Sequence, residues 1–136
     1  MALYGEETKA FELCPAEPEK GLPGVVLEIT EKQKTQGERN IVKWLWKFEV
    51  SEPVREDGEP FYLYLETYRS GPFVREIADN LHGEKISDEE WPRFDVQQFE
   101  GTECRLYTEH NTANNGRTYC NINKVDSLFG DPFNDQ

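Results

Sequence analysis

The sequence predicts a mainly β fold with five strands and a helical connector between the third and the fourth. Segments 41–50 and 61–68 alternate between large apolar residues and polar or charged ones, a period of two that is typical of strands with two different faces. Between 72 and 81 the apolar residues recur instead at the spacing of a helix. The pair Asn115-Gly116, between two further alternating segments, is a strong signal for a tight hairpin turn.

The first strand is expected at 24–33, after an irregular segment that contains three prolines. Val25, Leu27 and Ile29 occupy alternate positions in this strand, and we expect them to face the core. The strand then ends at a turn that contains Gly37, because glycine supplies the permissive backbone that a turn needs.

The second and third strands are expected at 39–50 and 61–68, joined by a loop that contains Asp57-Gly58. Their shared apolar face consists of Val42, Trp44, Trp46, Phe48 and Val50 from the second strand and Phe61, Leu63 and Leu65 from the third. Buried aromatic residues dominate the cores of small domains. We therefore assign the tryptophan-rich face to the core rather than to stacking on a ligand.

The connector is predicted to contain one helix and two shorter turns. Ser70 is a possible cap for the helix, Pro72 suits its first turn, and Gly83 ends it. Ser87 and Glu90 have the spacing of a capping box, which predicts a second short turn. A third turn is expected at 95–99, followed by the fourth and fifth strands at 102–109 and 118–125.

This order matches the five-stranded Greek-key barrel called the OB-fold, in which a helix links the third and fourth strands. A small α+β sandwich is the competing architecture. On the OB-fold interpretation, the chain divides into an irregular leader at 1–23, an OB-fold domain at 24–125 and an acidic C-terminal tail at 126–136.

The composition favours a cytoplasmic protein that is not an enzyme and needs no cofactor. Charged residues make up 31% of the chain, and no apolar run approaches the roughly 20 residues that cross a bilayer. The amino-terminal residues lack the apolar segment of a secretory signal. Catalytic motifs such as G-x-S-x-G, H-E-x-x-H and Gly-rich phosphate loops are absent from the sequence, so neither a catalytic residue nor a metal ligand is predicted.

The three cysteines are Cys14, Cys104 and Cys120, and in a reducing compartment we expect free thiols. Two alternatives involve the pair on the last two predicted strands. Cys104 and Cys120 could form a disulfide, or they could bind zinc together with His110, although the spacing is not that of common zinc motifs.

Charge is unevenly distributed along this chain, whose net charge is −12. Segment 24–48 holds five basic residues against three acidic ones, 61–75 holds two against one, and 104–124 holds three against one. These strand regions therefore total +5, and the rest of the chain carries −17. A mildly basic sheet with an acidic periphery favours weak or guided nucleic-acid binding over the strong basic footprint of a high-affinity binder.

The face of the hairpin opposite the predicted core combines lysines with tyrosines. Lys43 and Lys47 alternate with the core residues of the second strand, and Tyr62 and Tyr64 do so on the third. Single-stranded nucleic acids bind to cations that meet the backbone and to flat rings that stack on the bases. An ordinary half-exposed sheet face is the alternative interpretation of these tyrosines. The residues predicted to bind nucleic acid are Lys43, Lys47, Tyr62, Tyr64, Arg69, Arg105, Tyr107 and Arg117.

Several segments of the chain resemble small OB-fold proteins of phages and prophages that are similar to single-stranded DNA-binding proteins. The resemblance rests on 24–30, 41–48, 99–111 and 115–125 and extends over most of 24–125. It implies single-stranded DNA binding and an accessory role in replication or recombination. The tail is similar to the acidic Asp-Pro-Phe tips that recruit replication or recombination proteins, except that Phe133 is not the terminal residue.

Two other functions remain open at this point. The acidic loops and tail could dock onto a basic replication protein, which would make the chain a protein-interaction module. The excess of carboxylates could also imitate DNA and occupy the basic groove of an enzyme. The oligomeric state is not predicted by any feature of the sequence.

Overall fold

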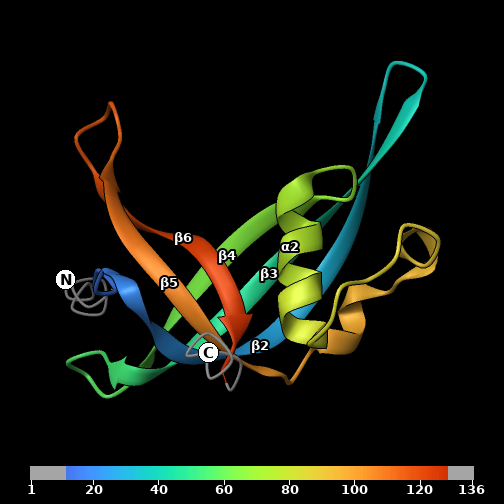
Figure 1. Cartoon of the computed structure of the whole chain (residues 1–136). Helices are drawn as coiled ribbons and strands as arrows, with labels where there is room; N and C mark the ends of the chain where they lie inside the picture. The colour runs from blue at the N-terminus through green and yellow to red at the C-terminus, as the bar shows by residue number, and fades with distance from the viewer. Residues whose placement is uncertain (1–11, 129–136) are drawn as a thin grey trace.

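The computed structural model describes residues 12–128, which contain one five-stranded antiparallel sheet and one α-helix (Figure 1). The strands are β2 (Glu17–Gln36), β3 (Arg39–Val54), β4 (Pro60–Tyr68), β5 (Glu103–Thr112) and β6 (Thr118–Ser127). Helix α2 (Pro72–His82) and the 3-10 turns η1 (Trp91–Arg93) and η2 (Val96–Phe99) connect β4 to β5. The mainly β character and the helix between the third and fourth strands are thus confirmed. Residues 1–11 of the leader and residues 129–136 of the tail lie outside the described part.

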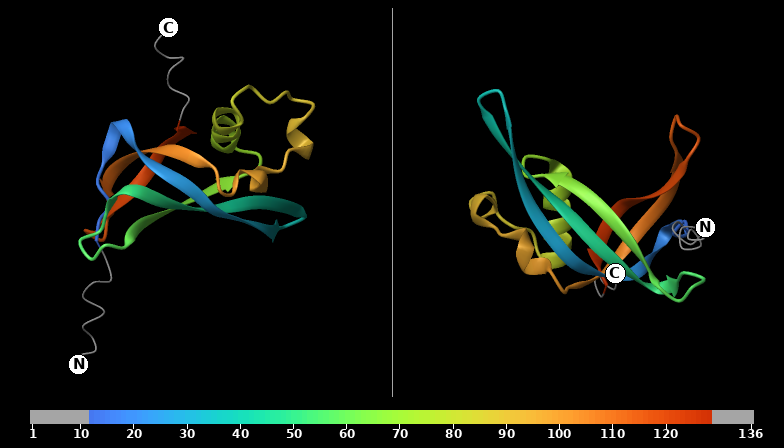
Figure 2. Two further views of the ribbon diagram at one scale, coloured as in Figure 1. Left: turned by 90° about the horizontal axis from the view of Figure 1, so that it is seen from below. Right: turned by 180° about the vertical axis from the view of Figure 1, so that it is seen from behind.

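The strand order in the sheet is β4-β3-β2-β5-β6, so the first strand lies at its centre. β2 pairs with β3 over most of its length and with β5 near its beginning. The edge strands β4 and β6 come into contact, but among residues 12–128 no ladder joins them, and the sheet is not closed. Both long hairpins, β2–β3 and β5–β6, extend toward the same end of the molecule (Figures 1 and 2).

β2 begins at Glu17, seven residues before the predicted start of the first strand. Residues 17–23 were expected to be irregular because of the prolines, yet Leu22 pairs with Leu106 and Pro23 with Arg105 of β5. Gly24 allows the backbone of β2 to pass close to both β3 and β5. A Cβ atom at Gly24 would come within 2.8 Å of both the Glu49 carbonyl oxygen and the Leu106 Cδ1 atom.

The prediction that Val25 and Leu27 face the core is wrong, because β2 contains a β-bulge. Val26 pairs with Phe48 and Glu28 pairs with the adjacent Lys47, so Leu27 is an extra residue in the ladder. The exposed fraction is 0% for Val26 and 38% for Leu27. The bulge places Val26 and Ile29 on the same inner face although they are three positions apart.

The core contains the aromatic face that the sequence assigned to it. Trp44, Trp46 and Phe48 expose at most 1% of their surface, and the rings of Trp46 and Phe48 stack with centroids 5.9 Å apart. The indole Nε1 of Trp46 donates a hydrogen bond to the buried Thr67 hydroxyl at 2.9 Å. The helix residues Val74, Ile77 and Ala78 and the η2 residues Val96 and Phe99 belong to the same core. Helix α2 therefore covers the inner face of the sheet.

The connector follows the predicted pattern with one exception. The helix cap is Gly71 rather than Ser70, and no side chain caps the first turn. At the other end Gly83 adopts the left-handed conformation with φ 92°, which favours glycine. Half of the predicted capping box is present, since the Glu90 amide donates to the Ser87 hydroxyl at 3.1 Å. Glu90 Oε1 accepts from that hydroxyl at 3.3 Å, whereas a full box uses the backbone amide of the serine.

Candidate nucleic-acid interface

The outer face of β3 and β4 combines lysines with exposed tyrosines, as the alternation predicted. Lys47 lies opposite Tyr64 in the ladder, and Lys43 lies opposite Tyr68. Tyr62, Tyr64 and Tyr68 have exposed fractions of 44%, 58% and 46%. Because helix α2 packs on the inner face, it leaves this side of the strands uncovered (Figure 2, right).

Both lysines contact tyrosine rings on the neighbouring strand. Lys47 Nζ lies 4.7 Å from the ring centroid of Tyr62, and Lys43 Nζ lies 5.9 Å from that of Tyr68. These are distances at which a cation is attracted to the face of an aromatic ring. The tyrosine with the largest exposed fraction, Tyr64, lies between these two cation–ring pairs along β4 and presents its ring to solvent.

A group of lysines surrounds the one carboxylate on the outer face of β4. Lys43 Nζ forms an ion pair with Glu66 at 2.8 Å. This hydrogen bond lowers the pKa of Glu66, and the charges of Lys43, Lys32 and Lys34 lower it further. The same bond raises the pKa of Lys43. The hairpin end of the face is therefore positively charged.

Lys32 and Lys34 of β2 were not among the predicted site residues, although the structure places them beside Lys43. Lys32 is the cross-strand partner of Lys43, and Lys34 that of Ile41. The sequence contains a signal for this arrangement. A two-residue turn at Gly37-Glu38, with glycine in the first position as in a type II′ turn, pairs position 32 with position 43.

The outer face carries carboxylates as well, so its positive charge is modest. Glu28 lies opposite Lys47, and Glu49 lies opposite Tyr62. With Glu66, three carboxylates therefore accompany the four lysines of the outer face of β2, β3 and β4, which are Lys32, Lys34, Lys43 and Lys47. This surface, formed by those lysines with Tyr62, Tyr64 and Tyr68, is called the lysine–tyrosine face below.

Arg69 follows β4 on the inner side of the sheet, away from the lysine–tyrosine face, and its Nη2 is already engaged. Its guanidinium donates hydrogen bonds to the carbonyl oxygens of Trp91 and Pro92 and lies 5.4 Å from the ring of Trp44. It lines a cleft of about 1020 Å³ together with Arg39 and Arg75. These contacts give Arg69 a structural role, because they attach the end of β4 to the connector.

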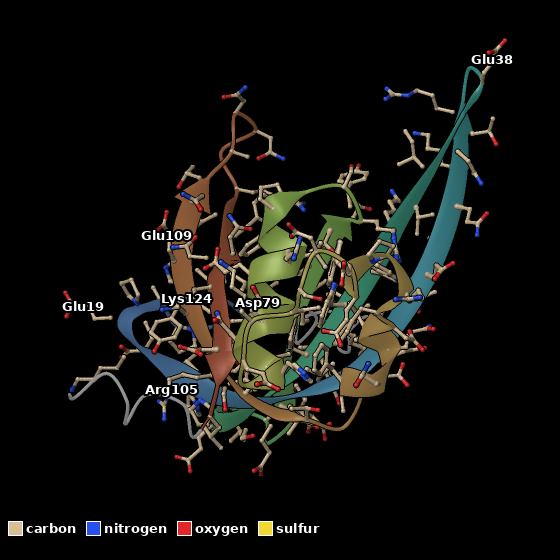
Figure 3. All side chains as sticks on the ribbon, turned by 45° about the vertical axis from the view of Figure 1, so that its right-hand side comes forward. Glu19, Glu38, Asp79, Arg105, Glu109 and Lys124 are labelled. Carbon is tan, nitrogen blue, oxygen red and sulfur yellow. The ribbon has the colours of Figure 1, made fainter. Side chains whose placement is uncertain are left out.

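The other predicted residues lie elsewhere on the sheet. Arg105 (Figure 3) and Tyr107 belong to β5, which β2 separates from β3 in the sheet. Arg105 Nη1 donates to the Lys20 carbonyl oxygen at 3.2 Å, and Lys124 Nζ covers the ring of Tyr107 at 5.4 Å. Arg117 is exposed in the turn of the β5–β6 hairpin. The structure thus brings together Lys43, Lys47, Tyr62 and Tyr64, and it separates them from these three residues.

The cysteines do not form either of the two sites considered from the sequence. Cys104 pairs with Ser127 and Cys120 with His110, so the two thiols are separated by roughly 20 Å along β6. All three cysteines are free. Among residues 12–128 no group of three or more His, Cys, Asp or Glu side chains is arranged to hold a metal ion.

Within the same described range, none of the helices has the length and apolar character required to cross a membrane. No family model matches the chain, and neither does any curated protein or solved structure.

Proposed function

We propose that this protein binds single-stranded DNA on the lysine–tyrosine face and acts as a non-catalytic accessory in replication or recombination. The observation that carries the proposal is the pairing of lysines with exposed tyrosines across β3 and β4. Lysines attract the phosphate backbone, and each base that stacks on an aromatic ring contributes about 1–3 kcal/mol. Both kinds of contact are available here within one hairpin.

We further propose that the sheet is an OB-type, partly open barrel. Support comes from the central first strand, which pairs with both the second and the fourth, and from the helix between the third and fourth strands. In OB-folds the face of strands two and three binds oligonucleotides, together with the loops that follow strands one and four. The corresponding elements here are the lysine–tyrosine face and the two hairpins that extend to one end of the molecule (Figure 1).

In the proposed complex the lysines and tyrosines have separate roles. Lys32, Lys34, Lys43 and Lys47 contact phosphates, while Tyr62 and Tyr64 stack on bases. Tyr64 is expected to contribute most, since its ring has the largest exposed fraction of the tyrosines on this face. Lys47 must move off the ring of Tyr62 before a base can stack there, which makes Tyr62 the weaker platform.

The test is a fluorescence titration of a labelled oligothymidylate at low salt. We expect Tyr64→Ala to weaken binding by about 5- to 150-fold, the range that corresponds to one lost base stack. Tyr64→Phe keeps the ring and should bind like the wild type. Lys47→Gln should also weaken binding. Lys85→Gln removes an exposed charge in the loop after α2 and serves as the matched control.

Two results would refute the proposal. One is the absence of binding at tens of micromolar, near the upper range of nonspecific dissociation constants. The other is equal affinity of Tyr64→Ala and the wild type, which would place the bound strand elsewhere. An acidic DNA mimic would give the first result and would in addition inhibit a nuclease with a basic groove.

A further inference from the structure

The chain segment that leads into β2, from Cys14 to Glu17, is held against the β5–β6 hairpin by hydrogen bonds. The carbonyl oxygen of Cys14 lies 2.7 Å from His110 Nε2. The hydroxyl of Thr108 donates to the carbonyl oxygen of Pro15 at 2.9 Å and accepts from the Glu17 amide at 2.8 Å. The backbone from the Cys14 carbonyl group to the Glu17 amide is thereby fixed relative to β5.

Cys120 of β6 faces the same segment. It is the cross-strand partner of His110, and its Sγ lies 3.7 Å from the Pro15 carbonyl oxygen. The two thiols also lie close enough for each to shift the pKa of the other. Two thiols from opposite ends of the described chain therefore meet beside a histidine and a threonine.

The two thiols differ in accessibility and in acidity. Cys14 has an exposed fraction of 3%, whereas Cys120 is only partly buried. The hydrogen bond from Cys14, supported by Thr108 and His110, lowers the pKa of Cys120 to about 7. The same hydrogen bond, together with burial, raises the pKa of Cys14. Because the thiolate is the nucleophile in disulfide exchange, Cys120 is the residue that reacts first.

We propose that Cys14 and Cys120 form a reversible disulfide, which closes by exchange with a low-molecular-weight disulfide of the glutathione type. The Cys120 thiolate attacks one sulfur of the oxidant, forms a mixed disulfide and expels one thiolate. Cys14 then loses its proton, attacks the Cys120 sulfur and expels the second thiolate. The protein loses two electrons and two protons, and one oxidant disulfide becomes two thiols.

The closed bond would join the segment before β2 to strand β6 on the inner side of the sheet. Two positions further along the same side of this hairpin, Thr108 and Ile122 form a cross-strand pair, and both are buried. The lysine–tyrosine face is on the opposite side of the sheet. The inference is therefore independent of nucleic-acid binding, and oxidation should leave that face unchanged.

The experiment is to incubate the reduced protein with oxidised glutathione and to measure its intact mass and peptide map. We expect the loss of two hydrogen atoms, a cross-link between the peptides that contain Cys14 and Cys120, and full reversal by dithiothreitol. Cys104→Ser should behave in the same way. Cys104 is fully buried, and burial raises its pKa to about 12, so this thiol should remain unreactive in the folded protein.

Single variants distinguish Cys120, which attacks the oxidant, from Cys14, which resolves the mixed disulfide. Cys14→Ser should stop at the mixed disulfide and gain one glutathionyl group on Cys120, while Cys120→Ser should gain none. Closure should also raise the melting temperature of the wild type, on the order of 10 °C, because the bond constrains the unfolded chain. A glutathionyl group that persists on Cys120 of the wild type, or a cross-link to Cys104, would overturn the proposal.

Discussion

At the scale of single residues, the contact between Trp46 and Thr67 shows how a polar atom is accommodated in the core. The indole nitrogen of Trp46 is buried, and the Thr67 hydroxyl is its hydrogen-bond acceptor at 2.9 Å. Thr67→Val keeps the shape of the side chain but leaves this nitrogen without an acceptor. We expect a loss of about 1–3 kcal/mol in the free energy of unfolding, measured by urea denaturation.

Thr67→Ser is the matched control, because serine retains the hydroxyl and removes one methyl group. It should lose clearly less stability than Thr67→Val. A Thr67→Val variant as stable as the wild type would show that the hydrogen bond to Trp46 makes no measurable contribution to the free energy of unfolding. Neither substitution alters the outer face of β4, since Thr67 lies on its inner side.

Single residues also show why the candidate interface was predictable only in part. Lys43, Lys47, Tyr62 and Tyr64 lie on two adjacent strands whose alternation fixes their direction. The role of Arg69 depends instead on backbone carbonyls of the connector, more than twenty positions away. No local pattern in a sequence reveals such partners.

At the scale of elements, β2 differed most from its prediction, and the cause is its bulge. The alternation rule assumes one residue per ladder position, which fails at Leu27. Strand β3 has no such irregularity between 39 and 50, and there the predicted faces are confirmed. The helix was predictable because its apolar spacing and its terminal glycine are local features.

Residues in and next to the η2 turn supply hydrogen-bond partners to the backbone of β2 beyond the point where β2 stops pairing with β5. That ladder stops at Val25. Beyond it the Ile29 amide donates to Glu100 Oε2 at 2.8 Å, and the Ile29 carbonyl oxygen accepts from Gln97 Nε2 at 2.9 Å. Glu100→Ala should therefore lower the free energy of unfolding by about 1 kcal/mol, because it leaves a partly buried amide without its acceptor.

Urea unfolding of Glu100→Ala, Glu100→Gln and Glu89→Ala tests this role. Glutamine retains a carbonyl acceptor and should restore most of the stability. Glu89 is an exposed carboxylate of the connector, and its removal should have little effect. A Glu100→Gln variant as unstable as Glu100→Ala would show that charge, rather than the hydrogen bond to Ile29, matters at this position.

At the scale of the whole molecule, the net charge of −12 opposes the positive lysine–tyrosine face, and the balance depends on ionic strength. A chain of this length has a radius of gyration of about 14 Å. The Debye length is about 10 Å at 0.1 M salt and about 30 Å at 0.01 M. A bound strand therefore responds mainly to nearby lysines at 0.1 M, but to the charge of the entire protein at 0.01 M.

This argument predicts a curved salt dependence of single-stranded DNA binding. Near 0.1 M, contacts from the four lysines should give a slope of roughly −2 to −3 in a plot of log affinity against log salt. Toward 0.01 M the slope should approach zero, because repulsion from the acidic periphery offsets the gain from the lysines.

Lys32→Gln combined with Lys34→Gln should reduce the slope near 0.1 M by about 1.4. Glu19→Gln combined with Glu89→Gln, at two exposed positions outside the face, should instead raise affinity mainly at 0.01 M. A slope that stays constant down to 0.01 M would mean that the acidic periphery does not influence binding.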